Sequence, residues 1–298
     1  MLDRQNTINT SSTRSGIGLH SARLVVITIR PAPVDTGIVF YRSDLTGIET
    51  AIPAHINNVS DVSLNTSICN SDGAEIGTIE HLMAAFAGMG IDNAYVDVSG
   101  PELPAFDGSS DRYCQMITEA GIKEQSEPRR YIKVLKPVSV QFHQAVSTLT
   151  PSSALHISTK IDFSDPFIGA SQYFYVHDEN SFVNELSAAR TFCLYKDVSQ
   201  MRAAGYAIGG SLDNAIVVKD GQMLNETPLR YTDEFVRHKT LDCLGDMRLA
   251  GLGIIGHMTT SRPGHRINSE LLKALFSDDS NYMIVTSDEL SDAEEKVA

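Results

Sequence analysis

Apolar and polar residues alternate over several short stretches of the first hundred positions, a pattern typical of strands with one buried face. We expect strands at residues 22–30 (ARLVVITIR), 37–41 (GIVFY) and 93–100 (NAYVDVSG). Between them, TIEHLMAAFAG (78–88) is apolar after its first turn and ends at glycines, which predicts a helix. A second helix is expected at SDRYCQMITEAG (110–121).

The second half of the chain again shows strand patterns followed by helical ones. Strand patterns occupy three segments: 131–142, 154–163 and 171–177. Helical patterns occupy four: 178–188, 196–204, about 232–250 and about 269–276. NAIVVKDGQMLN (214–225) predicts a hairpin that turns at Asp220-Gly221. Strands followed by helices, twice over, favour an α+β fold in two layers over a series of βαβ units.

The polar segment KEQSEPRR (123–130) has no periodicity and separates the two halves. We therefore predict an N-terminal domain over residues 1–126 and a C-terminal domain over residues 127–286. The remaining segment, SDELSDAEEKVA (287–298), is rich in acidic residues and is expected to form a solvated tail.

Composition limits the class of protein. With 298 residues, 42% of them hydrophobic and 20% charged, the chain is typical of a soluble protein of one or two domains. No stretch approaches the roughly 20 apolar residues that a membrane span needs. The N-terminal sequence MLDRQNTINTSSTRSG lacks the apolar core of a secretory signal. We expect a cytoplasmic protein without an integral membrane segment.

The formal net charge of −13 argues against nucleic acid as a partner, because binding a polyanion requires concentrated Lys and Arg. It remains compatible with an anionic small molecule held in a local basic pocket. The four cysteines are scattered along the chain: Cys69, Cys114, Cys193 and Cys243. This favours reduced thiols over a disulfide framework or a thiolate zinc site, so a metal would have to use histidines and carboxylates.

The segment EFVRHKTLDCLGDM (234–247) places His238, Asp242 and Asp246 at i, i+4 and i+8 of the expected helix, on one face. A His and an Asp at this spacing suit two ligands of one metal ion. A solvated helix face is the simpler interpretation, since charged residues are mostly exposed. One helix cannot complete a zinc site, so the metal interpretation requires a ligand from elsewhere.

Two other segments offer suitable side chains. Glu80 and His81 begin the helix at 78–88, and a Glu beside a ligand His is a familiar pair in zinc hydrolases. Without a metal, Glu80 would simply favour the helix N-terminus and His81 would be a packed histidine. RPGHRIN places His265 in a Pro-Gly turn, where it could be a ligand, a proton donor or an exposed loop residue.

Six motifs occur in order along the chain: T-I-E-H-L, G-I-D-N, D-G-S, A-R-T-F, E-F-V-R-H-K-x-L-D-x-x-G-D and G-H-x-x-N. Together they resemble one family, the UDP-3-O-acyl-N-acetylglucosamine deacetylases, from GIGLH near residue 16 to beyond residue 268. The resemblance implies a zinc-dependent enzyme that removes the N-acetyl group of UDP-3-O-(3-hydroxyacyl)-N-acetylglucosamine. This reaction is the committed step of lipid A synthesis in Gram-negative bacteria.

The same resemblance implies a fold and a cofactor. The fold would be two α+β domains packed with their helices between the sheets. Each domain would carry a small insert, and the second insert would form a passage for the acyl chain. The family suggests a monomer. The nitrogen and oxygen donors would accept Fe²⁺ as well as Zn²⁺, so the ion in the cell stays open.

Roles follow from the resemblance residue by residue. The zinc ligands would be His81, His238 and Asp242. The groups acting on the reacting bond would be Glu80 as general base, His265 as general acid, Asp246 as its partner and Thr191 as support for the oxyanion. The substrate contacts would be Lys239 near the phosphates, Phe163 on the uracil, Phe192 beside the acyl chain or sugar, and His20.

Two positions depart from the family pattern. Pro263 stands before Gly264-His265 where Ser is usual, and Cys193 stands where Gly is usual. Neither removes a group needed for the reaction, but both bear on substrate preference. Two other functions are alternatives: a silent relative that binds a UDP-sugar, which the complete set of site residues disfavours, and a zinc hydrolase of another amide.

Overall fold

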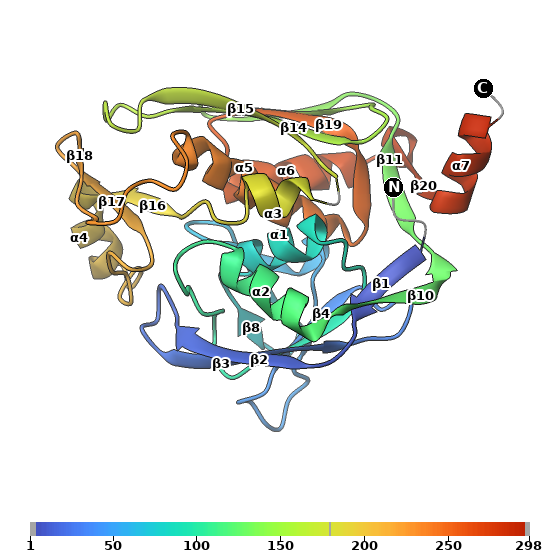
Figure 1. Cartoon of the computed structure of the whole chain (residues 1–298), viewed down its shortest axis with the longest axis horizontal. Coiled ribbons are helices and arrows are strands. Elements are labelled where there is room, and N and C mark those ends of the chain that lie inside the picture. Colours follow the sequence, from blue (N-terminus) through green and yellow to red (C-terminus); the bar gives the residue numbers. More distant parts are fainter. Residues whose placement is uncertain (1–3, 179, 296–298) are drawn as a thin grey trace.

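The computed structural model describes residues 4–178 and 180–295, and it places two sheets on the outside with helices between them (Figure 1). The sheet built mainly from the first half lies below the helices in this view, and the sheet built from the second half lies above them. The predicted α+β fold with helices between the sheets is therefore confirmed.

The lower sheet has five strands in the order β2-β3-β9-β4-β5. Their bounds are β2 Ser12–Ile17, β3 Leu24–Pro31, β9 Ala94–Val98, β4 Ile38–Arg42 and β5 Ala51–Pro53. Along β3 the side chains of Val25, Ile27 and Ile29 are fully buried, whereas Leu24 and Val26 are exposed. This alternation explains why one face of the sheet packs on the helices and the other faces solvent.

The upper sheet has seven strands. The path is β12-β13-β19-β11-β20, and β14 joins it by pairing with β19 and with β15. Their bounds are β11 Arg130–Val134, β12 Val138–Phe142, β13 Ala145–Thr150, β14 Leu155–Asp162, β15 Ala170–Val176, β19 Gly253–Ser261 and β20 Tyr282–Thr286. β14 and β11 both run parallel to β19. The chain therefore passes through the helical layer on its way from β14 to β19.

Among the described residues, the helical layer contains five α-helices: α1 Glu80–Gly88, α2 Asp111–Ala120, α3 Ser181–Glu185, α5 Glu234–Met247 and α6 His265–Phe276. Short 3₁₀ turns occur at η1 Ile56–Asn58, η2 Arg248–Ala250 and η3 Asp279–Asn281. α1 and α5 pack directly on each other. A Cβ placed on Gly245 of α5 would lie 2.1 Å from the carbonyl oxygen of Glu80 in α1, so only glycine permits this approach.

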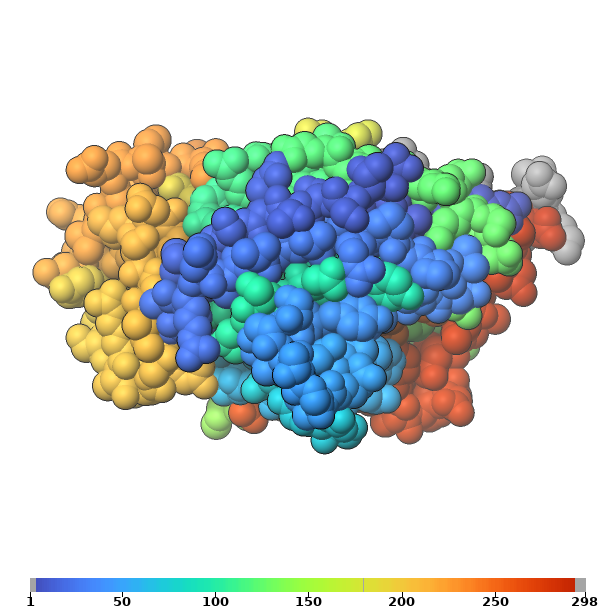
Figure 2. Space-filling view, turned by 90° about the horizontal axis from the view of Figure 1, so that it is seen from below, coloured from blue at the N-terminus to red at the C-terminus, as the bar shows by residue number. Residues whose placement is uncertain are grey.

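Each half also carries a small three-stranded sheet, as expected for the two inserts. The first consists of β6 Val59–Asp61, β7 Ser67–Cys69 and β8 Glu75–Ile76. The second consists of β16 Phe192–Leu194, β17 Ile216–Lys219 and β18 Gln222–Met223, with α4 Tyr195–Ala203 beside it. The second insert forms a lobe at one end of the molecule, and Figure 2 shows it beside the N-terminal strands. β17 and β18 turn at Asp220-Gly221, as predicted.

Some segments differ from the sequence prediction. Residues 122–128, at the expected domain boundary, form strand β10 (Ile122–Pro128), which pairs antiparallel with β1 (Arg4–Ile8). Most of β10 is exposed, so no alternating apolar signal marks it. The acidic tail begins with helix α7 (Ser287–Glu295), and its residues 296–298 lie outside the described part of the chain. Within the described residues, no helix has the length and apolar character needed to cross a membrane.

Candidate active site

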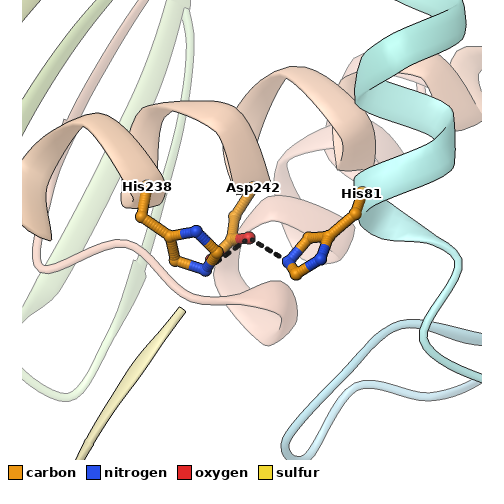
Figure 3. A group of neighbouring side chains, drawn as sticks. All are labelled: His81, His238 and Asp242. Carbon is orange, nitrogen blue, oxygen red and sulfur yellow. Dashed lines mark ion pairs between the residues drawn. The ribbon is translucent and has the colours of Figure 1, made fainter. Parts of the chain in front are cut away.

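His81, His238 and Asp242 lie together where α1 meets α5 (Figure 3). One ligand atom from each lies within 4.8 Å of the others, and all three side chains are buried. The predicted helical spacing brings His238 and Asp242 to one face of α5, and the contact at Gly245 brings the start of α1 beside them. The solvated-face interpretation of this stripe is therefore wrong.

The hydrogen bond of His238 fixes which ring nitrogen faces the cluster. Its Nδ1–H donates to the carbonyl oxygen of Ala189 at 3.0 Å, because a carbonyl can only accept. Burial lowers the pKa of His238 to about 3, against the raising effect of Asp242, so the ring is neutral. Its Nε2 therefore presents a lone pair toward Asp242, which is the form that binds metal ions.

Asp242 divides its two oxygens between different partners. Oδ2 accepts a hydrogen bond from Lys239 Nζ at 2.9 Å. Oδ1 lies 3.4 Å from His238 Nε2 and 3.6 Å from His81 Nε2. Burial acts against the charged form, but the ammonium group of Lys239 helps to hold the pKa of this carboxyl well below its usual range. A charged oxygen thus faces the lone pair of His238.

These donors fit a divalent metal ion. In a tetrahedral site with bonds of about 2.0–2.2 Å, neighbouring ligand atoms lie roughly 3.3–3.6 Å apart. The two distances from Asp242 Oδ1 agree with this spacing. A carboxylate oxygen and an imidazole lone pair repel each other unless a cation lies between them, so the arrangement suits an ion held by His81, His238 and Asp242.

Beside this cluster, Glu80 and His265 form a second pair. Their nearest atoms, Glu80 Oε1 and His265 Nε2, are 3.7 Å apart. The other ring nitrogen of His265 donates to Asp246 Oδ2 at 2.9 Å. Burial alone would lower the pKa of His265, but the carboxylates of Asp246 and Glu80 raise it to about 9. Burial raises the pKa of Glu80, and its histidine neighbours offset part of that effect.

The sequence predicted that His265 lies in a turn, and the structure shows that this is wrong. His265 is the first residue of α6, and Gly264 is the N-cap. The helix therefore starts earlier than the apolar pattern indicated, and its first turn carries Asn268 beside the site. Asn268 Nδ2 donates to Asp246 Oδ2 at 2.8 Å, so a single carboxylate oxygen serves both residues.

Thr66, just before β7, contacts the site in a way that the sequence did not reveal. Its Oγ1 donates to Asp246 Oδ1 at 2.6 Å, and its backbone N–H donates to Glu80 Oε2 at 3.1 Å. Thr66 and Asp246 are 180 positions apart in the chain. No local pattern around Thr66 indicates this pairing, because it arises only when the two halves pack.

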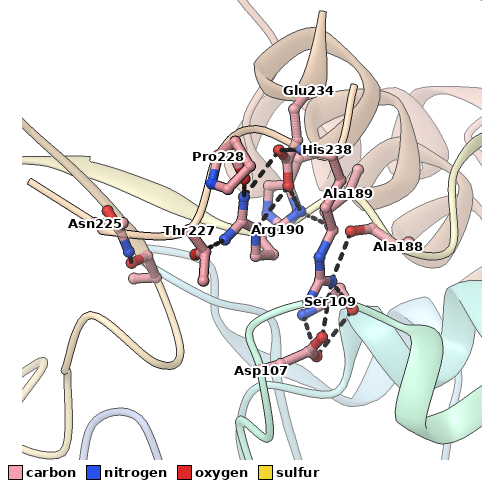
Figure 4. Close-up of polar contacts among 12 residues, drawn as sticks. Asp107, Ser109, Ala188, Ala189, Arg190, Asn225, Thr227, Pro228, Glu234 and His238 are labelled. Carbon is pink, nitrogen blue, oxygen red and sulfur yellow. Dashed lines mark hydrogen bonds and ion pairs between the residues drawn. The ribbon is translucent and has the colours of Figure 1, made fainter. Parts of the chain in front are cut away.

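A buried ion pair fixes the segment that contains Ala189 and Thr191 (Figure 4). Arg190 donates through its backbone N–H and Nε to Glu234 Oε1, at 3.0 and 2.8 Å. Glu234 is 0% exposed and lies one helical turn before His238 on α5. This pair therefore ties the carbonyl that orients His238 to the helix that carries His238.

A cavity with a volume of about 840 Å³ opens onto the cluster of His81, His238 and Asp242. Its polar lining includes Glu80, His81, His238 and Asp242. Four cationic side chains also line it: Arg202, Lys239, Arg262 and Arg266. Apolar residues from the second insert line another part: Val198, Met201, Leu212, Val217 and Leu224. The cavity lining thus combines cationic and apolar side chains in a protein whose net charge is strongly negative.

Most of the residues predicted to contact the substrate line this cavity. His20, Thr191, Phe192 and Lys239 line it. Phe163 is not among the lining residues but packs edge-on against Phe192, with ring centroids 5.3 Å apart. Its contact with a uracil stays a prediction. Lys239 also lies 5.7 Å from the centre of the Phe192 ring.

Comparisons with known proteins point to one family. The family model described as UDP-3-O-acyl N-acetylglycosamine deacetylase (LpxC) matches residues 5–277. The chain is 41% identical over 291 residues to the UDP-3-O-acyl-N-acetylglucosamine deacetylase of Shewanella oneidensis, covering 97% of this chain and 95% of the relative. Proteins with the same name from Shewanella sp. strain W3-18-1 and Shewanella baltica are 41% identical over 290 residues, with 97% and 94% covered. The chain therefore belongs to the UDP-3-O-acyl N-acetylglycosamine deacetylase (LpxC) family.

Proposed function

We propose that this protein hydrolyses the N-acetyl group of UDP-3-O-(3-hydroxyacyl)-N-acetylglucosamine to acetate and the free amine, the committed step of lipid A synthesis. The observation that carries the proposal is the buried cluster of His81, His238 and Asp242 beside Glu80 and His265. It occurs in a chain that is 41% identical, over nearly its whole length, to deacetylases of this name.

His81, His238 and Asp242 would hold the metal ion, and we propose Zn²⁺, although the same donors accept Fe²⁺. When bound, such an ion supplies Lewis acidity, which polarises a carbonyl and lowers the pKa of a bound water to about 7. The protein prepares this site in advance. The Ala189 carbonyl orients the ring of His238, and Lys239 occupies one oxygen of Asp242, which leaves the other for the ion.

Glu80 is the proposed general base. Thr66 holds its Oε2, which leaves Oε1 free on the side of His265 and the cavity. Oε1 would take a proton from the attacking water as the new carbon–oxygen bond forms. Burial favours this transfer, because it raises the pKa of the Glu80 carboxyl and so strengthens its affinity for the proton.

His265 is the proposed general acid. An amide nitrogen is a poor leaving group until it is protonated, so the carbon–nitrogen bond would break as His265 Nε2 delivers its proton. With a pKa of about 9, the ring carries that proton at neutral pH. Its Nδ1–H stays bound to Asp246, which orients Nε2 toward Glu80 and the cavity.

Thr191 and the cavity lining complete the proposed site. The Thr191 hydroxyl would donate to the carbonyl oxygen as negative charge develops on it. Lys239 and the arginines of the lining would contact the diphosphate, and the apolar residues of the second insert would receive the acyl chain. Phe192 would flank the sugar or acyl chain, and Phe163 the uracil.

His20 has a nitrogen suited to bind substrate. Its Nδ1 accepts the N–H of Ala207 at 3.1 Å, so at neutral pH the ring proton lies on Nε2. That nitrogen is buried and has no hydrogen-bond partner among the described residues, although the ring lines the cavity. We propose that it donates to an acceptor of the substrate.

The remaining expectations are also proposals. We propose that the protein is monomeric and cytoplasmic. All four cysteines are free thiols, which supports a reducing compartment. We retain a division near residue 126 into two domains, although β10 spans that position. The lower sheet and α1 would then belong to the first domain, and α5 and α6 to the second.

The test is a comparison of two substrates with the purified, metal-loaded protein. UDP-3-O-(3-hydroxyacyl)-N-acetylglucosamine should be deacetylated, with the released amine measured over time. UDP-N-acetylglucosamine, which lacks the acyl chain, should react at least ~100-fold more slowly, because binding energy from the chain is lost. Protein that leaves the acylated substrate intact, or that hydrolyses both equally well, would contradict the proposal.

A further inference from the structure

Thr66 uses three groups to join parts of the active site that come from different regions of the chain. Its hydroxyl donates to Asp246 on α5, and its N–H donates to Glu80 on α1. Its carbonyl accepts the N–H of Ile79, immediately before α1. The residue is 1% exposed, so water does not compete for these bonds.

The two bonds from Thr66 to carboxylates leave the other oxygen of each carboxylate for His265. Glu80 is held through Oε2, which leaves Oε1 at 3.7 Å from His265 Nε2. Asp246 is held through Oδ1, which leaves Oδ2 for His265 Nδ1. Thr66 thus contacts the carboxylate on either side of the histidine without contacting the histidine itself.

We propose that Thr66 is a positioning residue that fixes the orientation of Glu80 and Asp246 relative to His265. The inference rests on the proposed function, because it concerns the base and the acid assigned there. The N–H bond belongs to the backbone, so replacing Thr66 with Val or Ser retains it. The hydroxyl bond can be removed, and it is the one that crosses between the two halves of the chain.

The hydroxyl also affects the charge that His265 experiences. The titratable groups that face His265 are the carboxyls of Glu80 from α1 and of Asp242 and Asp246 from α5, and the neutral ring of His20 from the N-terminal segment. A donated hydrogen bond disperses the negative charge of Asp246. Without the Thr66 hydroxyl, more of that charge acts on His265, which then holds its proton to higher pH.

The test compares three variants of the full-length, metal-loaded protein with the wild type. Thr66→Val removes the hydroxyl at nearly constant shape, and Thr66→Ser restores it. Thr7→Val is the matched control, because Thr7 is also buried and its hydroxyl bonds a backbone N–H, that of Ala32, at 3.0 Å. Circular dichroism and metal content establish that each variant is folded and loaded before kcat/KM is measured from pH 5 to pH 10.

Thr66→Val should lower kcat/KM on the order of 10-fold, as for other residues that orient groups of a metal site. The alkaline limb of its pH profile should move upward by roughly 0.5 unit. Thr66→Ser should restore both properties, and Thr7→Val should change neither. A merely structural hydroxyl would affect stability alone and leave the alkaline limb in place.

Three results would overturn the inference: an alkaline limb that does not move upward, a Thr66→Ser variant as slow as Thr66→Val, or a Thr7→Val variant with the same kinetic defects. If Thr66→Val does not fold, the Ser variant decides: it must retain the wild-type limb within error. Wild-type protein that is metal-loaded but inactive on the acylated substrate would instead refute the proposed function, so the two failures are distinguishable.

Discussion

Replacing Asp246 with Asn removes the negative charge beside His265 with almost no change in size. Asp246 is nearly fully buried and accepts hydrogen bonds from His265, Asn268 and Thr66. An Asn side chain can keep its oxygen toward His265 and turn its NH₂ toward Thr66, whose hydroxyl can accept. The main effect of Asp246→Asn should therefore be electrostatic.

The size of the effect follows from the pKa of His265. Its value of about 9 lies well above the ordinary 6.5, and Asp246 is the carboxylate that contributes most to this increase. If the pKa returns to ~6.5 in the variant, the protonated fraction at pH 7.5 falls from ~97% to ~9%, about 10-fold. The ratio of wild-type to variant activity should be close to 1 at pH 6 and approach ~300 above pH 9.5.

The assay is kcat/KM for the acylated substrate from pH 5.5 to pH 10, with the two proteins matched for metal content. The general acid acts in its protonated form, so activity is lost as pH rises through its pKa. A bound cation would lower the pKa of His265 in the wild type and in the variant alike. The prediction therefore concerns the difference between these two pKa values. Altered geometry would multiply the ratio equally at every pH. A ratio that does not increase with pH would refute the assignment of His265 as an acid sustained by Asp246.

Two further predictions concern the metal and the ion pair. His238→Ala should weaken metal binding more than ~100-fold, whereas His265→Ala should leave metal content unchanged; inductively coupled plasma mass spectrometry of both variants checks this. Glu234→Gln should lower the free energy of unfolding by roughly 3 kcal/mol, because it leaves the buried Arg190 without its counter-charge. A denaturant midpoint within error of the wild type would contradict that estimate.

Helical spacing explains why part of the site could be predicted. His238, Asp242 and Asp246 lie four positions apart, so any α-helix through them presents all three on one face. Glu80-His81 stands at the start of an apolar segment, and its helix was predicted within two residues at its start. What the periodicity could not supply is that the two helices meet, which depends on the glycine at position 245.

Other features depend on tertiary contacts and were missed. The Thr66–Asp246 bond joins positions far apart in sequence, and Thr66 lies in a short, irregular segment. The start of α6 was misplaced because Pro263-Gly264 indicated a turn, whereas Gly264 is the N-cap of the helix. Strand β10 has an exposed, polar surface, so its pairing with β1 left no hydrophobic signal in the sequence.

The most direct test of the proposed reaction measures metal content and deacetylation together, for the wild type and Glu80→Gln. Both proteins should bind one metal ion per chain, and the wild type should deacetylate UDP-3-O-(3-hydroxyacyl)-N-acetylglucosamine. Glu80→Gln should be at least ~100-fold slower, because its general base is missing. A metal-loaded variant that retains activity within a few fold of the wild type would contradict the role of Glu80. A metal-loaded wild type without activity would contradict the proposed reaction.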